Sequence, residues 1–166
     1  MKEKILILIL LLNLIGCKSY SFKNIDIGDA KTIQIDFFNN QATLIEPTLS
    51  QKFTEKLQDL FARQTKLTLT NFNADLYFSG EITEYKVTPL SGLSNQTAAQ
   101  NRLTIIVNVR FENKLNDSKN FDKKFSFYSD FSANEQLYGA ILENALEEIN
   151  ERITQDIFNL SVANDF

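Results

Sequence analysis

Hydrophobic and polar side chains alternate along several stretches of the chain, which is typical of half-buried β-strands. The clearest alternation spans residues 102–112, where every second side chain from Leu103 to Phe111 is apolar. Gly, Pro, Asn and Asp residues separate the alternating stretches, as expected for connecting turns. The pattern predicts strands over the following ranges: 31–38, 67–70, 75–88, 102–112 and 121–131.

The phase of the alternation adds detail to two of these strands. In the first strand Ile33, Ile35 and Phe37 share the inward side, and Asn39-Asn40-Gln41 is expected to end it. In the strand over residues 75–88 the apolar side chains change phase near Thr83-Glu84. A β-bulge there would return both halves to one face of a sheet, because one extra residue shifts the side-chain period.

Two stretches have helical periodicity instead. The first follows Pro47, begins with a possible capping box, Thr48-x-x-Gln51, and carries an apolar stripe to Thr65. The second begins with another possible capping box, Ser132-x-x-Glu135, and carries a longer apolar stripe as far as Ile157. Each predicted helix has one apolar side and therefore needs a surface to cover.

The order of elements, β-α-β-β-β-β-α, defines the expected fold class. We predict an α+β two-layer sandwich, with two helices packed on one face of a mixed or antiparallel sheet of four to five strands. The domain is expected over residues 30–159, followed by a flexible tail over residues 160–166.

The N-terminal segment has the pattern of an export signal. Basic residues precede an apolar run that ends at Leu14-Ile15-Gly16-Cys17, and this run is shorter than the ~20 residues of a transmembrane helix. The ending resembles the bacterial lipobox, so we expect residues 1–16 to be a signal peptide, Cys17 to be lipidated and residues 17–29 to form a tether. The alternative is an ordinary signal peptide with a cysteine just beyond the cleavage point.

Composition narrows the possible chemistry. The chain has no histidine and one cysteine, which excludes Ser-His-Asp and Cys-His catalysis and the common zinc sites. We expect no enzyme activity, no metal and no cofactor beyond the lipid on Cys17. The net charge of −4 argues against a nucleic-acid partner. A hydrolase built on two converging carboxylates stays open as the less favoured alternative.

Several strings of the chain, in their order, resemble the LPS-assembly lipoprotein family LptE. They cover most of the expected domain: Thr32-Ile-Gln-Ile-Asp-Phe-Phe38, Pro47-Thr-Leu-Ser-Gln-Lys-Phe-Thr-Glu-Lys-Leu57, Asp75-Leu-Tyr-Phe-Ser-Gly-Glu-Ile-Thr-Glu-Tyr85, Asn101-Arg-Leu-Thr-Ile105 and Glu148-Ile-Asn-Glu-x-Ile-x-x-Asp-Ile-Phe158.

The resemblance implies a non-catalytic protein of the Gram-negative outer membrane. It would plug the lumen of the β-barrel LptD, help that barrel to assemble and assist the transport of lipopolysaccharide to the cell surface. Lys18 follows Cys17 where an aspartate would signal inner-membrane retention, so the expected location is the outer membrane, facing the periplasm. The alternative is an auxiliary lipoprotein of a different envelope transporter.

The resemblance also directs attention to exposed basic residues, because lipid binding in the family is attributed to such residues. Lys86, Arg102 and Arg110 are the candidates for contacts with lipopolysaccharide or the barrel, since the strand phase turns both arginines away from the core. The alternative is that they are solvated strand residues paired with Glu or Asp. The loop expected over residues 89–101 either inserts into the barrel or is a plain surface loop.

Overall fold

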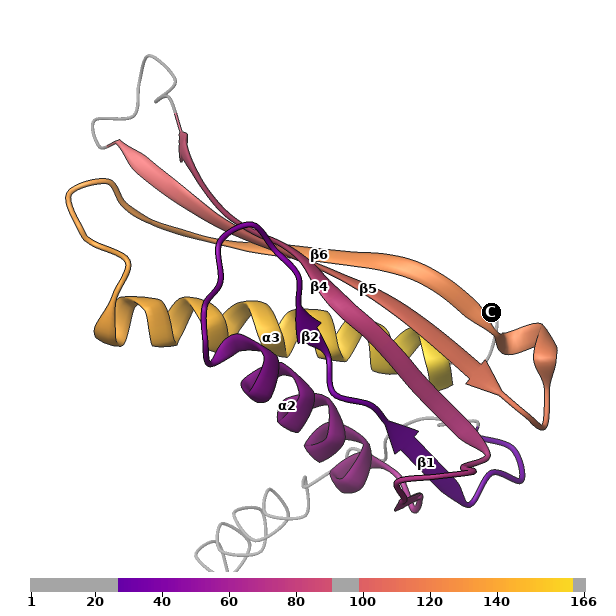
Figure 1. The fold of residues 1–166 in the computed structure, drawn as a ribbon. Helices are drawn as coiled ribbons and strands as arrows, with labels where there is room; N and C mark the ends of the chain where they lie inside the picture. The colour runs from indigo at the N-terminus through magenta and orange to yellow at the C-terminus, as the bar shows by residue number, and fades with distance from the viewer. Residues whose placement is uncertain (1–26, 91–98, 163–166) are drawn as a thin grey trace, which may run out of the picture.

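The computed structural model describes residues 27–90 and 99–162, which form one sheet covered by two helices (Figure 1). In chain order the elements are β1 (Thr32–Ile35), β2 (Asn39–Asn40), α2 (Leu49–Gln64), β3 (Thr68–Leu69), β4 (Leu76–Leu90), β5 (Gln100–Asn113), the 3₁₀ turn η2 (Asp117–Lys119), β6 (Phe121–Ser132) and α3 (Gly139–Val162). Signal peptide, Cys17 and most of the expected tether lie outside the described residues, as do residues 91–98 of the expected loop.

The sheet is mixed and has six strands. Its order is β3-β1-β4-β5-β6, with β2 beside β4; β1 pairs parallel with β3 and β4, whereas β4, β5 and β6 form antiparallel neighbours. Both helices pack on one face, where they share a single hydrophobic core with the sheet. The α+β two-layer sandwich is therefore confirmed, with one more strand than the four to five predicted.

Aromatic side chains form the centre of this core. The ring of Phe78 on β4 lies between Phe61 of α2 and Phe111 of β5, with ring centroids 5.1 and 4.6 Å away. Phe158 of α3 packs on Phe61 at 4.9 Å. The core thus joins both helices to the middle of the sheet, which is how the domain holds together without a disulfide.

The bulge predicted in β4 is confirmed. The register with β5 shifts between Ile82 and Glu84. Ile82, before the bulge, and Tyr85, after it, therefore both face the helices. Residues 100–101 and 89–90, expected in a loop, are the paired ends of β5 and β4.

The end of the first strand differs from the prediction. Ile35 pairs with Phe78 and Asn39 with Glu81, so four steps along this edge match three steps along β4. The extra residue changes the side-chain phase: Phe38 is fully buried, whereas Phe37 is 53% exposed. Phe37 was therefore wrongly predicted inward, and Asn39-Asn40 is a short strand rather than a break.

Helix α2 begins where predicted, but without the capping box. Thr48 occupies the N-cap position, yet its hydroxyl donates to Glu46 Oε1 at 2.9 Å, and Gln51 donates to Glu55 within the helix. Two other polar residues of this helix, Ser50 and Thr54, are buried, and the Thr54 hydroxyl accepts a hydrogen bond from Phe38 N at 3.1 Å.

Helix α3 starts later than predicted. Ser132 ends β6, and its hydroxyl accepts a hydrogen bond from Asn134 N in a turn, so the capping box Ser132-x-x-Glu135 does not open the helix. Gly139, at a φ of +55° that suits glycine, leads into α3. At the other end α3 continues to Val162, which is buried, so helix and core extend three residues beyond the expected domain end at residue 159.

Candidate functional site

The sheet face opposite the helices, which we call the open face, is polar. It is formed by alternate side chains of β4, β5 and β6, the ones that point away from the core. The register places all three predicted site residues on this face: Arg102 opposite Asp130, Arg110 opposite Asp122, and Lys86 opposite Thr104. The predicted direction of both arginines is therefore correct.

Arg102 is held by two neighbours on β6. Its Nε and Nη2 donate to the two carboxylate oxygens of Asp130 at 2.7 and 2.8 Å, and its guanidinium carbon lies 3.4 Å from the ring centroid of Tyr128. The hydrogen bonds raise the pKa of Arg102 and lower the pKa of Asp130. A planar guanidinium fixed by a bidentate pair and an aromatic ring keeps one orientation.

Arg110 is more loosely paired. Its Nε donates to Asp122 at 3.1 Å, and Glu81 lies 3.9 Å from its Nη2, while half of its side chain is exposed. Both arginines thus have the carboxylate partners of the alternative interpretation, although neither is buried.

Lys86 has no hydrogen bond or ion pair with any residue that the structure describes, and it is exposed. It is a diagonal neighbour of Arg102, since Thr88 pairs with Arg102, which places their Cα atoms about 7 to 8 Å apart. Arg110 lies eight residues from Arg102 along β5, or about 27 Å. The structure therefore joins Lys86 and Arg102 in one basic site and leaves Arg110 apart.

Asp130 and Tyr128 are the parts of this site that the sequence analysis did not identify. A usable signal was present, because the short turn between β5 and β6 fixes the hairpin register, and that register sets Arg102 opposite Asp130. Tyr128, two residues before Asp130, then lies on the same face.

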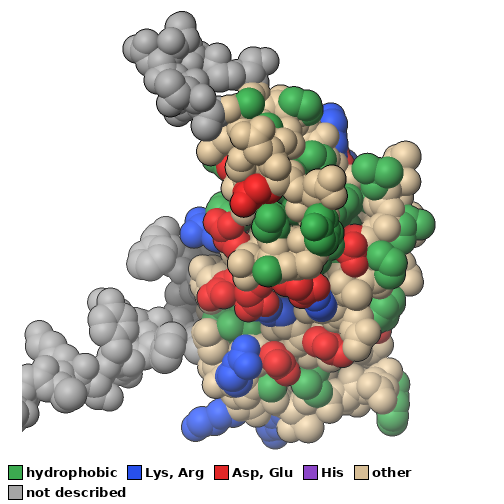
Figure 2. Space-filling model, turned by 90° about the vertical axis from the view of Figure 1, so that its left-hand side faces the viewer, with side chains coloured by type: hydrophobic (Ala, Val, Ile, Leu, Met, Phe, Trp, Pro, Cys, Tyr) green, Lys and Arg blue, Asp and Glu red, His purple; other side chains and the backbone are tan. Residues whose placement is uncertain are grey.

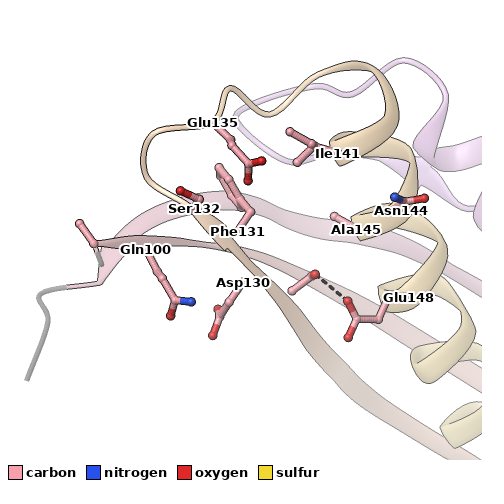
Figure 3. A pocket seen from close by; sticks show the side chains of 11 residues that line it. Gln100, Asp130, Phe131, Ser132, Glu135, Ile141, Asn144, Ala145 and Glu148 are labelled. Atoms are coloured by element: carbon pink, nitrogen blue, oxygen red, sulfur yellow. Dashed lines mark hydrogen bonds between the residues drawn. The ribbon is translucent and has the colours of Figure 1, made fainter. Parts of the chain in front are cut away.

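A pocket of about 350 Å³ lies beside this site, between the end of β6 and the start of α3 (Figure 3). Phe131 and Ile141 point toward each other at its apolar side, and Ser129 donates a hydrogen bond to Glu148 at 2.6 Å across it. Asp130 also lines the pocket, but its carboxylate is bound to Arg102 and its pKa is lowered. A carboxylate held ionised in this way is poorly suited to serve as a general acid.

The helix side of the molecule has a different electrostatic pattern. Figure 2 shows acidic side chains in a band across one side of the molecule, with basic side chains among them. Two lysines of α2 reach acids of α3: Lys52 bonds Glu143, and Lys56 bonds Glu147. These pairs follow the contact between the helices, but the seven acids of α2 and α3 outnumber their four lysines and arginines, so the helix side stays acidic.

Within residues 27–90 and 99–162, no cluster of three or more Asp, Glu, His or Cys side chains is placed to bind a metal ion. In the same ranges, neither helix combines the length and apolarity needed to span a bilayer.

Comparison with known families identifies the class of protein. The family model LptE, described as lipopolysaccharide-assembly, matches residues 30–161, which is most of the chain and includes every described strand. The chain belongs to this LptE family of lipopolysaccharide-assembly proteins. A comparison with curated proteins gives no significant match.

Solved structures with the same fold have distant sequences. A hypothetical protein from Chlamydia trachomatis aligns with a TM-score of 0.54 at 12% identity, covering 81% of this chain and 99% of its own. Uncharacterized lipoprotein B from Nitrosomonas europaea aligns with a TM-score of 0.53 at 14% identity, covering 81% of this chain and 83% of its own. At these identities the likeness extends to the fold alone.

Proposed function

We propose that this protein is an outer-membrane lipoprotein that plugs and helps to assemble the LptD β-barrel and so assists lipopolysaccharide transport. In this proposal Cys17 carries the lipid anchor, the domain faces the periplasm, and the protein has no catalytic role and no cofactor besides the lipid. Membership of the family supports the part in lipopolysaccharide assembly. The partnership with LptD, the lipid anchor and the outer-membrane location go beyond family membership and are part of this proposal.

The observation that supports a barrel partner best is the contrast between the faces of the sheet. The long antiparallel hairpins β4-β5 and β5-β6 have one buried apolar face and one open face with charged, hydroxyl and amide side chains. The lumen of a large outer-membrane barrel is polar. A body that keeps its apolar residues inward and offers polar groups outward is suited to fill such a lumen.

Within the open face, we assign contacts with lipid A phosphates or with acidic lumen groups to Lys86, Arg102 and Arg110. Lys86 and Arg102 form the stronger pair, because Lys86 has no described partner and Arg102 is fixed in orientation by Asp130. Asp130 occupies two of the guanidinium donors, so a phosphate would share Arg102 with it and bind Lys86 directly. Arg110 would act separately at the far end of the face.

The direct test is purification of the full-length protein from membranes, followed by identification of whatever comes with it. Recovery of a large β-barrel and lipopolysaccharide is expected. Recovery of an inner-membrane transporter in place of the barrel would favour the alternative of a different export system. Metabolic labelling with a fatty acid, lost in Cys17→Ala, tests the anchor separately.

The assigned residues need their own test. Arg102→Ala combined with Arg110→Ala is expected to weaken lipopolysaccharide binding and barrel recovery at least tenfold, and Lys86→Ala to weaken lipopolysaccharide binding further. Lys52→Ala with Lys56→Ala removes the same charge from the helix side and serves as the matched control. Unchanged binding and unchanged barrel recovery in the arginine variant would refute the assignment.

A further inference from the structure

The first described residue, Ile27, lies at the end of the sheet that carries the turn between β5 and β6. Ile27 packs against the core and lines a pocket of about 390 Å³ together with Leu115 and Asn116 of the β5-β6 turn. Cys17 precedes Ile27 by ten residues, a length of chain that spans at most about 35 Å when extended. If Cys17 is lipidated, as proposed above, this end of the domain cannot lie far from a membrane surface.

The same end exposes two large apolar side chains. Phe72 is 79% exposed in the turn before β4, and Leu115 is 54% exposed in the turn after β5. Lys114 connects the two turns, because its Nζ donates to Asn73 Oδ1 at 3.1 Å and its backbone N to the Asp75 carbonyl at 2.9 Å. Phe72 and Leu115 therefore lie in adjacent turns at one end of the sheet, which we call the tether end.

Lysines surround these apolar side chains. Those near the tether end are Lys31, Lys66, Lys114, Lys119, Lys123 and Lys124. The acids are Asp29, Asp75, Glu112, Asp117 and Asp122, of which Asp122 is paired with Arg110. The excess of positive charge contrasts with the net charge of −4 for the whole chain. Asp75 is moreover engaged, because its Oδ2 accepts three hydrogen bonds, from Lys31 N and from Thr32 N and Oγ1.

The opposite end offers a useful contrast. Tyr138 is 67% exposed there, so it is an exposed aromatic residue comparable with Phe72. At this end the acids Glu84, Asp130, Glu135 and Glu148 outnumber the basic residues Lys86 and Arg102. An exposed aromatic residue beside acids is repelled from an anionic surface, whereas one beside lysines is attracted to it.

We propose that the tether end docks on the surface of a bilayer containing anionic phospholipid. Phe72 and Leu115 enter the interface between headgroups and acyl chains, and the lysines keep their ammonium groups at the level of the phosphates. Each lysine close to an anionic surface contributes about a fivefold gain in partitioning. This contact would hold the tether end at the bilayer surface, and it depends on the proposed function only for the nearby lipid anchor.

The test uses residues 18–166, which lack the lipid and contain the whole described domain. The chain has no tryptophan, so Phe72→Trp provides a single fluorescent reporter. With vesicles of phosphatidylcholine and phosphatidylglycerol its emission is expected to shift to the blue and to be quenched by brominated acyl chains. With phosphatidylcholine alone, or at high salt, the shift should be lost.

Tyr138→Trp is the matched control at the opposite end, and its emission should stay unchanged with either vesicle. A shift of Tyr138→Trp without one of Phe72→Trp, or no shift of either, would overturn the proposal.

In the Phe72→Trp background, Lys66→Ala with Lys114→Ala should reduce partitioning about 25-fold. Lys52→Ala with Lys56→Ala, an equal change of charge on the helix side, should leave it nearly unchanged, and an equal loss in both would also refute docking by this end. Barrel recovery from membranes is scored separately, so either proposal can fail alone.

Discussion

The two faces of the sheet are built from the same strands and differ in almost every physical respect. Along β5, Leu103, Ile105 and Val107 are completely buried, while Arg102 and Arg110, on the same strand, have 31% and 51% of their side chains exposed. The buried face is held by close apolar packing, and the open face by paired charges and hydrogen bonds. The buried face therefore stabilises the fold, and the open face can carry residues that suit a partner.

The largest effect on stability is expected from truncation at the centre of the buried face. Phe78→Ala removes the ring that contacts both Phe61 and Phe111. Loss of a buried phenyl group from a packed core costs about 3–5 kcal/mol, measured as the free energy of unfolding in urea. A loss below about 1 kcal/mol would mean that the sheet and helices do not share this core.

Gly80→Ala should be next in size. A Cβ at this position would lie 2.1 Å from the backbone oxygen of Asn108 and 2.7 Å from the Phe38 ring, so strand and ring must both move. Overpacking of this kind costs about 1–3 kcal/mol. Ser79→Ala, whose side chain points to the open face, is the control, and equal urea midpoints for the two variants would contradict the assignment of faces.

Asp75 should make stability depend on pH in the acid range. Its hydrogen bonds, first the one from Lys31 N, lower its pKa below the ordinary 3.8. The folded state therefore binds the proton less tightly, and the stabilisation is complete above about pH 5 and lost as pH falls through the folded pKa. Asp75→Asn should lower the urea midpoint at pH 7, and its difference from the wild type should shrink as pH falls through the folded pKa of Asp75. A constant difference across this range would show that the carboxylate charge is not responsible.

The smallest effect on stability is expected at the ion pair of the open face. Asp130→Asn weakens the bidentate contact with Arg102, but exposed pairs contribute little to stability, so the urea midpoint should change only slightly. Its effect on Arg102 should be visible elsewhere, as a broader NMR signal of the Arg102 Nε–H when the guanidinium is no longer fixed. A large loss of stability would show that the open face also holds the fold together.

The sequence analysis succeeded where one residue's environment follows from its own strand or helix. The stripe of α2 and the bulge near Thr83 follow from side-chain periodicity, and so does the outward direction of Arg102. It failed where tertiary contacts decide. Phe38 is buried in place of Phe37 because the edge strand has one residue more than β4 over this stretch. Ser132 has the sequence pattern of a helix cap, but it pairs with Gln100 and ends β6. The pairing of Lys86 with Arg102 required the register of two hairpins.

The central claim is that the open face meets the partners and the helix side does not. It is tested most directly by purifying two matched variants from membranes: Arg102→Ala with Arg110→Ala on the open face, and Lys52→Ala with Lys56→Ala on the helix side. Both should fold with nearly wild-type stability. We predict that the open-face variant loses most of the β-barrel and lipopolysaccharide that the wild type retains, while the helix-side variant keeps both. Full retention by the open-face variant, or loss by the helix-side variant alone, would contradict the claim.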